Sequence, residues 1–244
     1  MDDVSAAKLL ISCLDLTSLG ENDSQYQIED LCNRAHTPYG NVAAVCIWPK
    51  FISLAKQHLP KGEIKVATVV NFPHGDTDFY QLATDINHAL TFGADEIDAV
   101  FPYRSFLNQD LQSCEQFLQT VTQLCNDTPT KIILETGELR HASQIAEATK
   151  LCLNAGVNFI KTSTGKSPIS ATPEAANIIL ETISTAKTKA GFKASGGIKT
   201  IEDAKKYLTL AQTIMGNNWV NSQHFRIGAS SLLTNLLETI KQGY

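Results

Sequence analysis

The 244-residue sequence lacks several patterns that would indicate common classes of protein. Its longest apolar runs, such as residues 64–72, are too short and too interrupted to cross a bilayer. The formal net charge is −5, which argues against a general nucleic-acid-binding surface. The first residues, Met1-Asp2-Asp3, are acidic and lack the basic start of a secretion signal. We therefore expect neither a membrane nor a nucleic acid as a partner.

The sequence also lacks a recognisable metal-binding or redox motif. Its six cysteines include no CxxC pair, and its six histidines are scattered without ligand spacing to a cysteine. In a chain of this size, the simplest interpretation is that the cysteines are reduced core thiols of a cytoplasmic protein. We expect no metal ion.

What the sequence does contain is a regular alternation of short apolar runs and longer helical patterns. With 43% hydrophobic residues, the chain can form one well-cored domain over residues 1–244. Several runs are rich in Val and Ile without clean alternation, which is typical of strands buried on both faces. Eight strands are predicted, at 13–17, 42–48, 64–71, 96–101, 131–136, 159–161, 191–194 and 225–228. Helical patterns lie between them, for example at 78–91, 111–125 and 172–186.

This alternation predicts an α/β fold, either a (β/α)8 TIM barrel or a doubly wound open sheet. Polar or reactive residues follow nearly every predicted strand at its carboxyl end, which favours the barrel because barrels keep their active sites there. These residues are Asp15, Thr17, Cys46, Asn71, Asp98, Glu135, Thr136, Lys161, Lys193 and Ser230.

Two lysines carry the strongest functional signal. Lys161 ends the run VNFIK and Lys193 lies in AGFKASGG, so both ammonium groups adjoin apolar strand residues. The alternative is a strand-end lysine that extends to solvent, which is common. Two lysines entering one barrel mouth would repel each other and lower the pKa of one or both. A protonated Lys193 could thus keep Lys161 neutral, as a nucleophile that attacks a carbonyl must be.

Asp98 is the natural partner of these lysines. It lies between Ile97 and Ala99, so we expect its side chain in the barrel interior or mouth. A buried carboxylate is usually paired, and it could relay protons through water during imine chemistry. A purely structural ion pair is the alternative. Asp95 and Glu96 precede it, and we expect these two acids to be solvated at the strand start.

Four further residues give weaker signals. Asp15 alone is best interpreted as a helix or turn cap, and Cys46 as a small core residue. In a barrel mouth, both could line a substrate pocket together with Thr17. Glu135 could orient a lysine.

Three glycine-containing loops have the composition of phosphate-binding loops, and they follow the sixth, seventh and eighth predicted strands. Glycines allow backbone amides to approach an anion, and a helix that starts after Ser230 would add its positive end. Barrels often bind phosphate at the last two of these positions. The loops are Thr164-Gly165-Lys166, Gly196-Gly197-Ile198-Lys199 and Gly228-Ala229-Ser230-Ser231.

Taken together, these segments resemble the deoxyribose-phosphate aldolase family over almost the whole chain. The matching segments are LDLTSL (14–19), HTPYGNVAAVCIWPKF (36–51), VATVVNFPHG (66–75), GADEIDAVFPYR (93–104), KIILETGEL (131–139), NFIKTSTGK (158–166), GFKASGGIKT (191–200) and FRIGASSLL (225–233).

The resemblance implies a class I aldolase on a (β/α)8 barrel that needs no cofactor. The family reaction is the reversible cleavage of 2-deoxy-D-ribose 5-phosphate to D-glyceraldehyde 3-phosphate and acetaldehyde, in the catabolism of deoxyribonucleosides. By resemblance, Lys161 forms the imine, Lys193 perturbs it and assists proton transfer, and Asp98 is the proton relay. Asp15, Thr17 and Cys46 match pocket positions near the sugar. Relatives are often dimers, so a homodimer is an expectation.

Two departures and two alternatives accompany this resemblance. Lys199 stands where many relatives have arginine, so a point charge replaces a planar fork at the phosphate. Tyr244 is the candidate counterpart of a terminal tyrosine that helps proton transfer in relatives, but its tail is shorter. One alternative is another lysine-dependent phospho-sugar aldolase, of the transaldolase kind, and the other is an inactive sensor of a phosphorylated ligand. The complete set of two lysines and Asp98 argues against the sensor.

Overall fold

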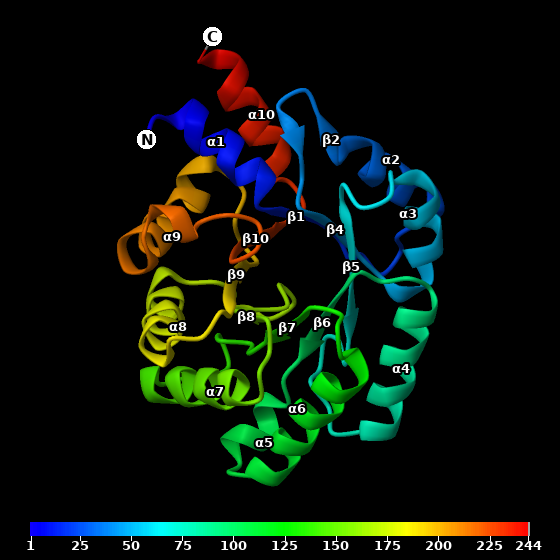
Figure 1. The fold of residues 1–244 in the computed structure, drawn as a ribbon, viewed down its shortest axis with the longest axis vertical. Coiled ribbons are helices and arrows are strands. Elements are labelled where there is room, and N and C mark those ends of the chain that lie inside the picture. The colour runs from blue at the N-terminus through cyan, green and yellow to red at the C-terminus, as the bar shows by residue number, and fades with distance from the viewer. Residues whose placement is uncertain (244) are drawn as a thin grey trace.

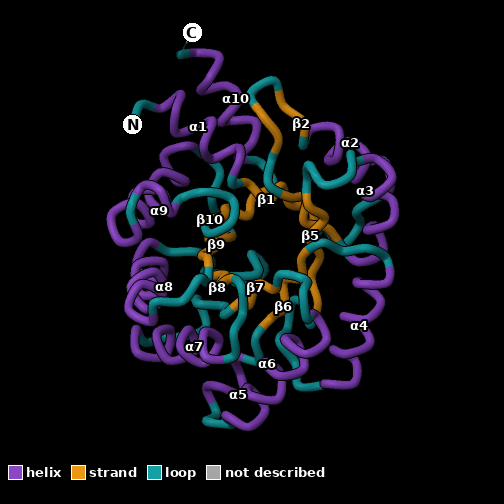
Figure 2. Tube along the Cα trace, viewed as in Figure 1, coloured by secondary structure: helices purple, strands orange, loops and turns teal. Residues whose placement is uncertain are grey.

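Eight parallel strands close into a barrel in the computed structural model, which describes residues 1–243. The strand order around the barrel is β1-β10-β9-β8-β7-β6-β5-β4. Figure 1 shows the helices arranged around this barrel, and Figure 2 shows the strands as a central ring inside them. The predicted (β/α)8 barrel is therefore confirmed, and the doubly wound open sheet is excluded because the sheet is closed.

The barrel strands lie close to their predicted positions. They are β1 (Leu14–Ser18), β4 (Ala44–Ile47), β5 (Lys65–Val70), β6 (Glu96–Val100), β7 (Thr130–Ile133), β8 (Phe159–Lys161), β9 (Gly191–Ser195) and β10 (Phe225–Ala229). Four predicted strands run past the observed carboxyl end, and after two of them the backbone turns at a non-glycine residue with positive φ. Asn71 has φ 55° after β5, and Glu135 has φ 55° after β7. Such residues are uncommon and give no clear signal in a sequence.

The helices cover the outside of the barrel. They are α1 (Asp3–Ser12), α2 (Gln25–Arg34), α3 (Ile52–His58), α4 (Phe79–Thr91), α5 (Tyr103–Leu107), α6 (Leu111–Cys125), α7 (Ala142–Asn154), α8 (Pro173–Ala186), α9 (Ile201–Met215) and α10 (Leu232–Gln242). A short hairpin, β2 (His36–Thr37) and β3 (Gly40–Asn41), and two 3-10 turns, η1 (Pro49–Phe51) and η2 (Asn217–Trp219), complete the described elements.

Local signals in the sequence account for the helix boundaries. Thr172 accepts a hydrogen bond from the backbone N–H of Ala175 and Pro173 opens α8, as the sequence predicts. The predicted helix at 111–125 coincides with α6. No helix within residues 1–243 has the length and hydropathy needed to cross a membrane.

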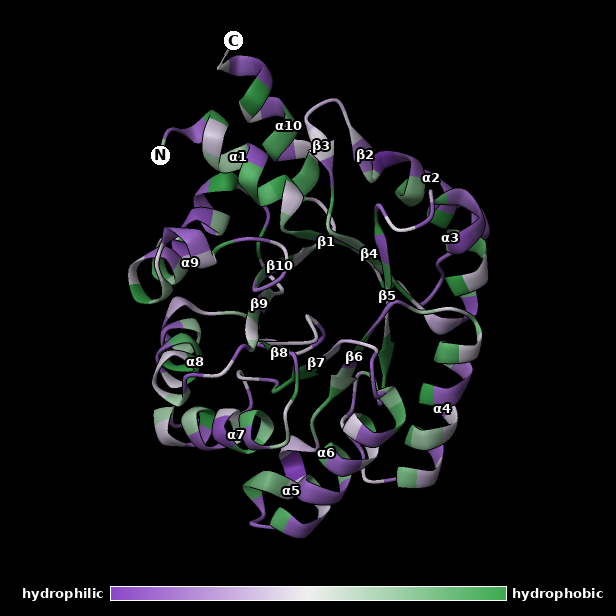
Figure 3. Cartoon of the chain, viewed as in Figure 1, coloured by the Kyte–Doolittle hydropathy of each residue, from purple (hydrophilic) through white to green (hydrophobic). Residues whose placement is uncertain are grey.

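The main core lies between the strands and the helices. It includes Phe101, whose ring contacts those of Phe106 and Phe117. The helices in Figure 3 turn their hydrophobic faces towards the barrel and their hydrophilic faces outward. All six cysteines are buried free thiols, as predicted.

Inside the barrel, side chains divide into an apolar wall and a charged region. The apolar wall comes from β4, β5 and the residue after β1, and it is separate from the main core: Leu19, Ala44, Cys46, Ala67 and Val69. The charged region comes from β6 to β10 and β1. Alternate residues of a strand point to the same face, so Glu96 and Asp98 both point inward from β6 while Ile97 joins the outer core.

The packing around Phe117 gives a testable prediction for the fold. Phe117 is fully buried and its ring lies 6.1 Å from that of Phe101. Phe117→Ala should lower the free energy of unfolding by about 3–5 kcal/mol, because it removes a buried ring and leaves a cavity. Urea unfolding measures this loss. The control is Phe92→Ala, whose side chain is 49% exposed, and the expected change is within about 0.5 kcal/mol. Equal losses in the two variants would contradict the assigned core.

Candidate active site

Seven charged side chains meet inside the barrel, and we call them the charge cluster. They project from β1, β6, β7, β8, β9 and β10, so the closure of the barrel brings together residues up to 211 positions apart. The cluster contains four cations and three carboxylates: Lys131, Lys161, Lys193, Arg226, Asp15, Glu96 and Asp98.

Asp98 is the centre of the charge cluster. Its Oδ2 atom accepts hydrogen bonds from the Nζ atoms of Lys161 and Lys193, each at 2.8 Å, and its Oδ1 atom accepts one from Lys131 at 2.9 Å. Burial by itself would raise the pKa of Asp98, but the charges of the three lysines hold that pKa well below its usual range. Asp98 is therefore ionised at neutral pH.

The two predicted lysines occupy different electrostatic environments. Burial lowers the pKa of Lys161, repulsion from Lys193 lowers it further, and attraction to Asp98 only partly opposes these effects. Burial would also lower the pKa of Lys193, but Asp15 at 2.5 Å and Asp98 at 2.8 Å raise that pKa above its usual value. Lys161 therefore gives up its proton more readily than Lys193.

Towards the amino ends of the strands, the charge cluster contains three residues that the sequence did not indicate as part of the site. Lys131 contacts Glu96 at 2.5 Å, and the guanidinium of Arg226 contacts Asp15 at 2.6 Å and Glu96 at 2.9 Å. Arg226 also donates through Nε to the carbonyl of Ser222. The expectation that Glu96 is solvated is wrong, because it is only 5% exposed and pairs with two cations. The signal that could have identified Glu96 is its spacing of two from Asp98.

Of the acids at the start of β6, only Asp95 is partly exposed. It pairs with Lys56 at 2.8 Å and accepts the backbone N–H of Val66. Asp15 does not cap a helix or turn: its carboxylate lies in the charge cluster, and its pKa is held below its usual range by Lys193, Arg226 and Lys131 despite full burial.

Room for the lysine side chains comes from small residues on neighbouring strands. A Cβ atom on Gly228 would lie 2.8 Å from Ser195 Oγ and 2.9 Å from Lys193 Cε, so β10 needs glycine beside Lys193. Cys46 is buried in the apolar wall, and burial raises the pKa of its thiol. Its sulfur is thus a neutral neighbour of the two lysines, and it does not line the cavity described next.

A cavity of about 380 Å³ lies at the carboxyl ends of the strands. All three predicted phosphate loops and Thr17 line it. The predicted residues on its wall are Thr17, Thr164, Gly165, Lys166, Gly196, Gly197, Lys199, Gly228, Ser230 and Ser231. Lys161, Lys193 and Asp98 are buried beneath this wall.

The shape of this cavity depends on a close approach of two loops. Gly196 has φ 91°, and a Cβ atom there would lie 2.6 Å from Ser170 Oγ and 3.1 Å from the Cα of Gly165. Lys166 donates to the carbonyl of Leu19 at 2.8 Å, which joins the loop after β8 to the loop after β1. The helix α10 begins at Leu232, so its positive end faces the cavity next to Ser231.

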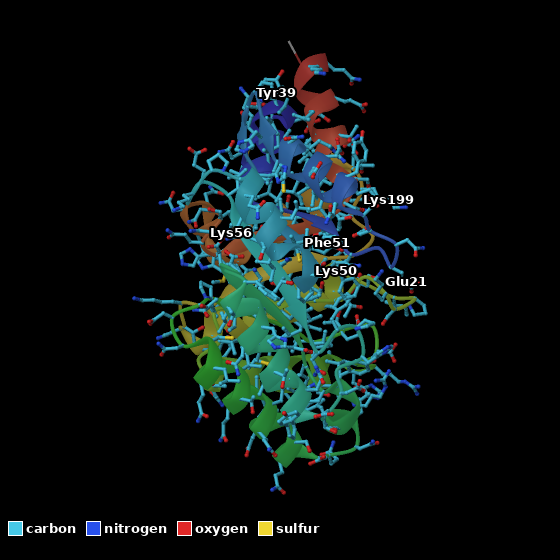
Figure 4. The ribbon with its side chains drawn as sticks, turned by 90° about the vertical axis from the view of Figure 1, so that its right-hand side faces the viewer. Glu21, Tyr39, Lys50, Phe51, Lys56 and Lys199 are labelled. Atoms are coloured by element: carbon cyan, nitrogen blue, oxygen red, sulfur yellow. The ribbon has the colours of Figure 1, made fainter. Side chains whose placement is uncertain are left out.

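Figure 4 views the barrel from the side and distinguishes its two ends. Lys199 and Glu21, from the loops after β9 and β1, lie towards the right of this view, and Lys56 lies to the left. A second cavity, of about 560 Å³, lies at the amino ends of the strands and is lined in part by Glu96 and Arg226. The charge cluster therefore extends from one cavity towards the other.

Of two further sequence hypotheses, the structure bears only on the one for Glu135. Glu135 accepts hydrogen bonds from the backbone N–H and the hydroxyl of Thr164, the latter at 2.5 Å, so it orients the first phosphate loop and not a lysine. Burial raises the pKa of Glu135. Tyr244, the candidate terminal tyrosine, lies outside the described residues.

A parallel barrel with charge-paired lysines beneath a glycine-lined cavity can support the chemistry of an aldolase that uses a lysine amine. Comparison with known families agrees. The model for DeoC/LacD family aldolases matches residues 9–237, so the chain belongs to this family.

Solved structures with the same fold cover nearly the whole chain. A candidate deoxyribose-phosphate aldolase from Coccidioides immitis is 29% identical, with a TM-score of 0.85 over 96% of this chain and 86% of its own. A candidate deoxyribose-phosphate aldolase from Toxoplasma gondii is 22% identical, with a TM-score of 0.89 over 98% and 97%. The tetrameric deoxyribose phosphate aldolase from Aeropyrum pernix is 22% identical, with a TM-score of 0.77 over 100% and 98%. The latter two show a shared fold.

The position of Asp98 between three buried cations gives a stability prediction. Asp98→Asn keeps the shape of the side chain but removes its charge, so Lys131, Lys161 and Lys193 lose their common counter-ion. The free energy of unfolding should fall by about 3–5 kcal/mol, as expected when one partner of a buried pair is removed. Denaturant unfolding at neutral pH measures it.

The matched control is Asp76→Asn, which removes a carboxylate from an exposed pair with Arg104 at 4.0 Å. Its unfolding midpoint should stay at that of the wild type, because exposed pairs are screened by solvent. If Asp98→Asn were as stable as this control, the charges of the cluster would not be coupled as the distances indicate.

Proposed function

We propose that this aldolase is a class I enzyme that reversibly cleaves 2-deoxy-D-ribose 5-phosphate to D-glyceraldehyde 3-phosphate and acetaldehyde. The observation that carries the proposal is the Lys161 amine, buried 2.8 Å from Asp98 with a lowered pKa, beneath a cavity suited to a phosphate. The candidate aldolase from Coccidioides immitis, at 29% identity, supports the same substrate.

The first step is imine formation at Lys161. Its neutral amine attacks the C1 aldehyde of the open-chain sugar, and loss of water gives an imine. The protonated imine is an electron sink beside C2. The lowered pKa of Lys161 favours attack at neutral pH, because only the free amine is nucleophilic.

The second step is cleavage of the C2–C3 bond. The C3 hydroxyl loses its proton, the C3 carbonyl forms, and the electrons of the broken bond move to C2 and the imine to give an enamine. Asp98, held ionised by its lysine neighbours, can accept this proton through a water molecule. Lys193 stays protonated between Asp15 and Asp98, so it supplies positive charge and hydrogen-bond donors beside the reacting groups, and through them it assists proton transfer.

The last steps release both products. Glyceraldehyde 3-phosphate leaves from the cavity, C2 of the enamine takes up a proton, and hydrolysis of the imine frees acetaldehyde and Lys161. The same groups serve in both directions, so the route also describes addition of acetaldehyde to the phosphorylated aldehyde.

The substrate phosphate is assigned to the 380 Å³ cavity. Its wall combines two ammonium groups, Lys166 and Lys199, with hydroxyl groups and backbone amides of the three glycine loops. This combination of cations and N–H donors suits a dianion. Thr17, Asp15 and Cys46 are proposed to border the sugar and the reacting carbon. We further propose a cytoplasmic enzyme of deoxyribonucleoside catabolism that forms a homodimer; light scattering of the purified protein tests the assembly.

Borohydride trapping tests the nucleophile. Incubation with acetaldehyde and sodium borohydride should add a reduced two-carbon group to Lys161, located by intact mass and peptide mapping. Lys161→Leu is the control and should give no adduct. An adduct on Lys193 or on a surface lysine, or no adduct at all, would refute the assignment.

Lys199→Met tests the phosphate site. Loss of one cation from the cavity should raise KM for deoxyribose 5-phosphate by about tenfold, the equivalent of one charge-assisted contact. The kcat/KM for unphosphorylated deoxyribose should not change, since it makes no such contact. Lys150→Met, an exposed substitution on α7, is the control. Parallel losses with both substrates would place Lys199 outside the phosphate site.

A further inference from the structure

The charge cluster contains one more cation than it contains carboxylates. Its cations are Lys131, Lys161, Lys193 and Arg226, against the carboxylates Asp15, Glu96 and Asp98. All seven residues are at most 5% exposed. An unbalanced charge is costly in such a place, so the cluster is most stable when one cation gives up its proton.

The contacts identify which cation that is. Within residues 1–243, Lys131 lies within 4 Å of all three carboxylates, and Lys193 and Arg226 each pair with two. Lys161 pairs with Asp98 alone. It is therefore the cation with the least compensation, and the cluster is neutral when its amine is neutral.

We propose that Lys131 and Glu96, towards the amino ends of the strands, act as positioning residues that set the charge state of the Lys161 amine through Asp98. This inference rests on the proposed role of Lys161. Lys131 occupies Oδ1 of Asp98 while Lys161 and Lys193 share Oδ2, so its charge weakens the hold of Asp98 on Lys161. Glu96 in turn holds Lys131 at 2.5 Å.

Neither residue can touch the substrate. Glu96 borders the cavity at the amino ends of the strands, and Lys131 lies fully buried between Glu96 and Asp98. The phosphate cavity is at the opposite end of the barrel. Any effect of Lys131 or Glu96 on the chemistry must therefore pass through other charges of the cluster, and Asp98 is the carboxylate that contacts both Lys131 and Lys161.

Titratable groups from several surrounding strands face Lys161. They are Asp98 on β6, Lys193 on β9 and Cys46 on β4, and Lys131 lies on the adjacent β7. Glu135, a further buried carboxyl after β7, is engaged by Thr164. The cysteine is a neutral thiol, so the balance at Lys161 is decided by Asp98 and by the cations that share it.

The balance of charges predicts the sign of each substitution. Lys131→Met leaves three cations with three carboxylates, so Lys161 should keep its proton and its pKa should rise. Glu96→Gln leaves four cations with two carboxylates, so the pKa of Lys161 should fall. The double variant has three cations and two carboxylates, the same excess as the wild type, and its pKa should return towards the wild-type value.

Competitive labelling measures this pKa without any catalysis. A trace of acetic anhydride acetylates only the free amine, so the extent of labelling at Lys161, mapped by peptide mass against pH, reports its titration. We expect a rise of about one pH unit in Lys131→Met, which is typical for the loss or gain of one nearby charge. We expect a fall of similar size in Glu96→Gln. Because the readout needs no substrate, it stays valid if the proposed reaction is wrong.

Activity provides the second readout. The acid limb of the pH profile for kcat/KM should move with the labelling pKa, because activity rises with pH as Lys161 loses its proton. At a pH below the limb, Lys131→Met should be about tenfold slower than the wild type, and adding Glu96→Gln should recover that loss. The matched control is Lys56→Met, from an exposed pair with Asp95, which should shift neither readout.

The double variant separates charge balance from simple disruption. If Lys131 only supports the position of Asp98, removal of Glu96 as well would deepen the defect and would not reverse it. Identical Lys161 titration in all variants, or a double variant displaced as far as Lys131→Met, would overturn the inference. If Lys131→Met fails to fold, the opposite shift in Glu96→Gln and the charge-matched double variant still decide it.

Discussion

The structure depends on the mutual pairing of seven ionisable side chains that are almost wholly buried inside the barrel. Each isolated charge would be very costly in that environment, and only its partners make it tolerable. Asp98 bears the greatest share, since it is the common acceptor of three lysines. The closed barrel turns alternate strand residues inward. This places Asp98 within hydrogen-bond distance of its three lysine partners, so the charged residues of this sequence can be buried there.

The surrounding packing makes room for this network. Gly228 leaves space for the Lys193 side chain, and the alanines of β4 and β5 keep the facing wall small. Main-core residues outside the barrel pack the helices against the strands, and the seven charged residues are not part of that core. A large aromatic residue of the main core, such as Phe117, therefore stabilises the fold. The lack of a side chain at Gly228 instead leaves room for Lys193 in the charge cluster.

Much of this arrangement is legible in the sequence, and the reasons for the omissions are physical. Val- and Ile-rich runs predict the strands, and residues at the carboxyl ends of parallel strands converge, so Lys161, Lys193 and the glycine loops could be placed together. Lys131, Glu96 and Arg226 were not placed with them. They lie at or near the start of their strands, where a charged residue is usually solvated, and for Glu96 only its spacing of two from Asp98 indicates an inward side chain. The early ends of β5 and β7 depend on the left-handed backbone at Asn71 and Glu135, and no residue pattern in the sequence predicts that conformation.

The division of the barrel interior explains why a single charge matters at Lys161. Phosphate binding is assigned to loops after β8, β9 and β10, open to solvent, where added ions screen any one charge. The Lys161 amine, the proposed nucleophile, lies below those loops, between the charged strands and the apolar wall that contains Cys46, Ala67 and Val69. That wall supplies no competing charge, so the balance between cations and carboxylates acts on the buried Lys161 with little attenuation. An enzyme built this way can bind a dianion with Lys166 and Lys199 at the barrel mouth and still keep the buried amine of Lys161 neutral. The two tasks do not conflict, because the cavity lysines govern phosphate binding and the charge cluster governs the protonation of Lys161.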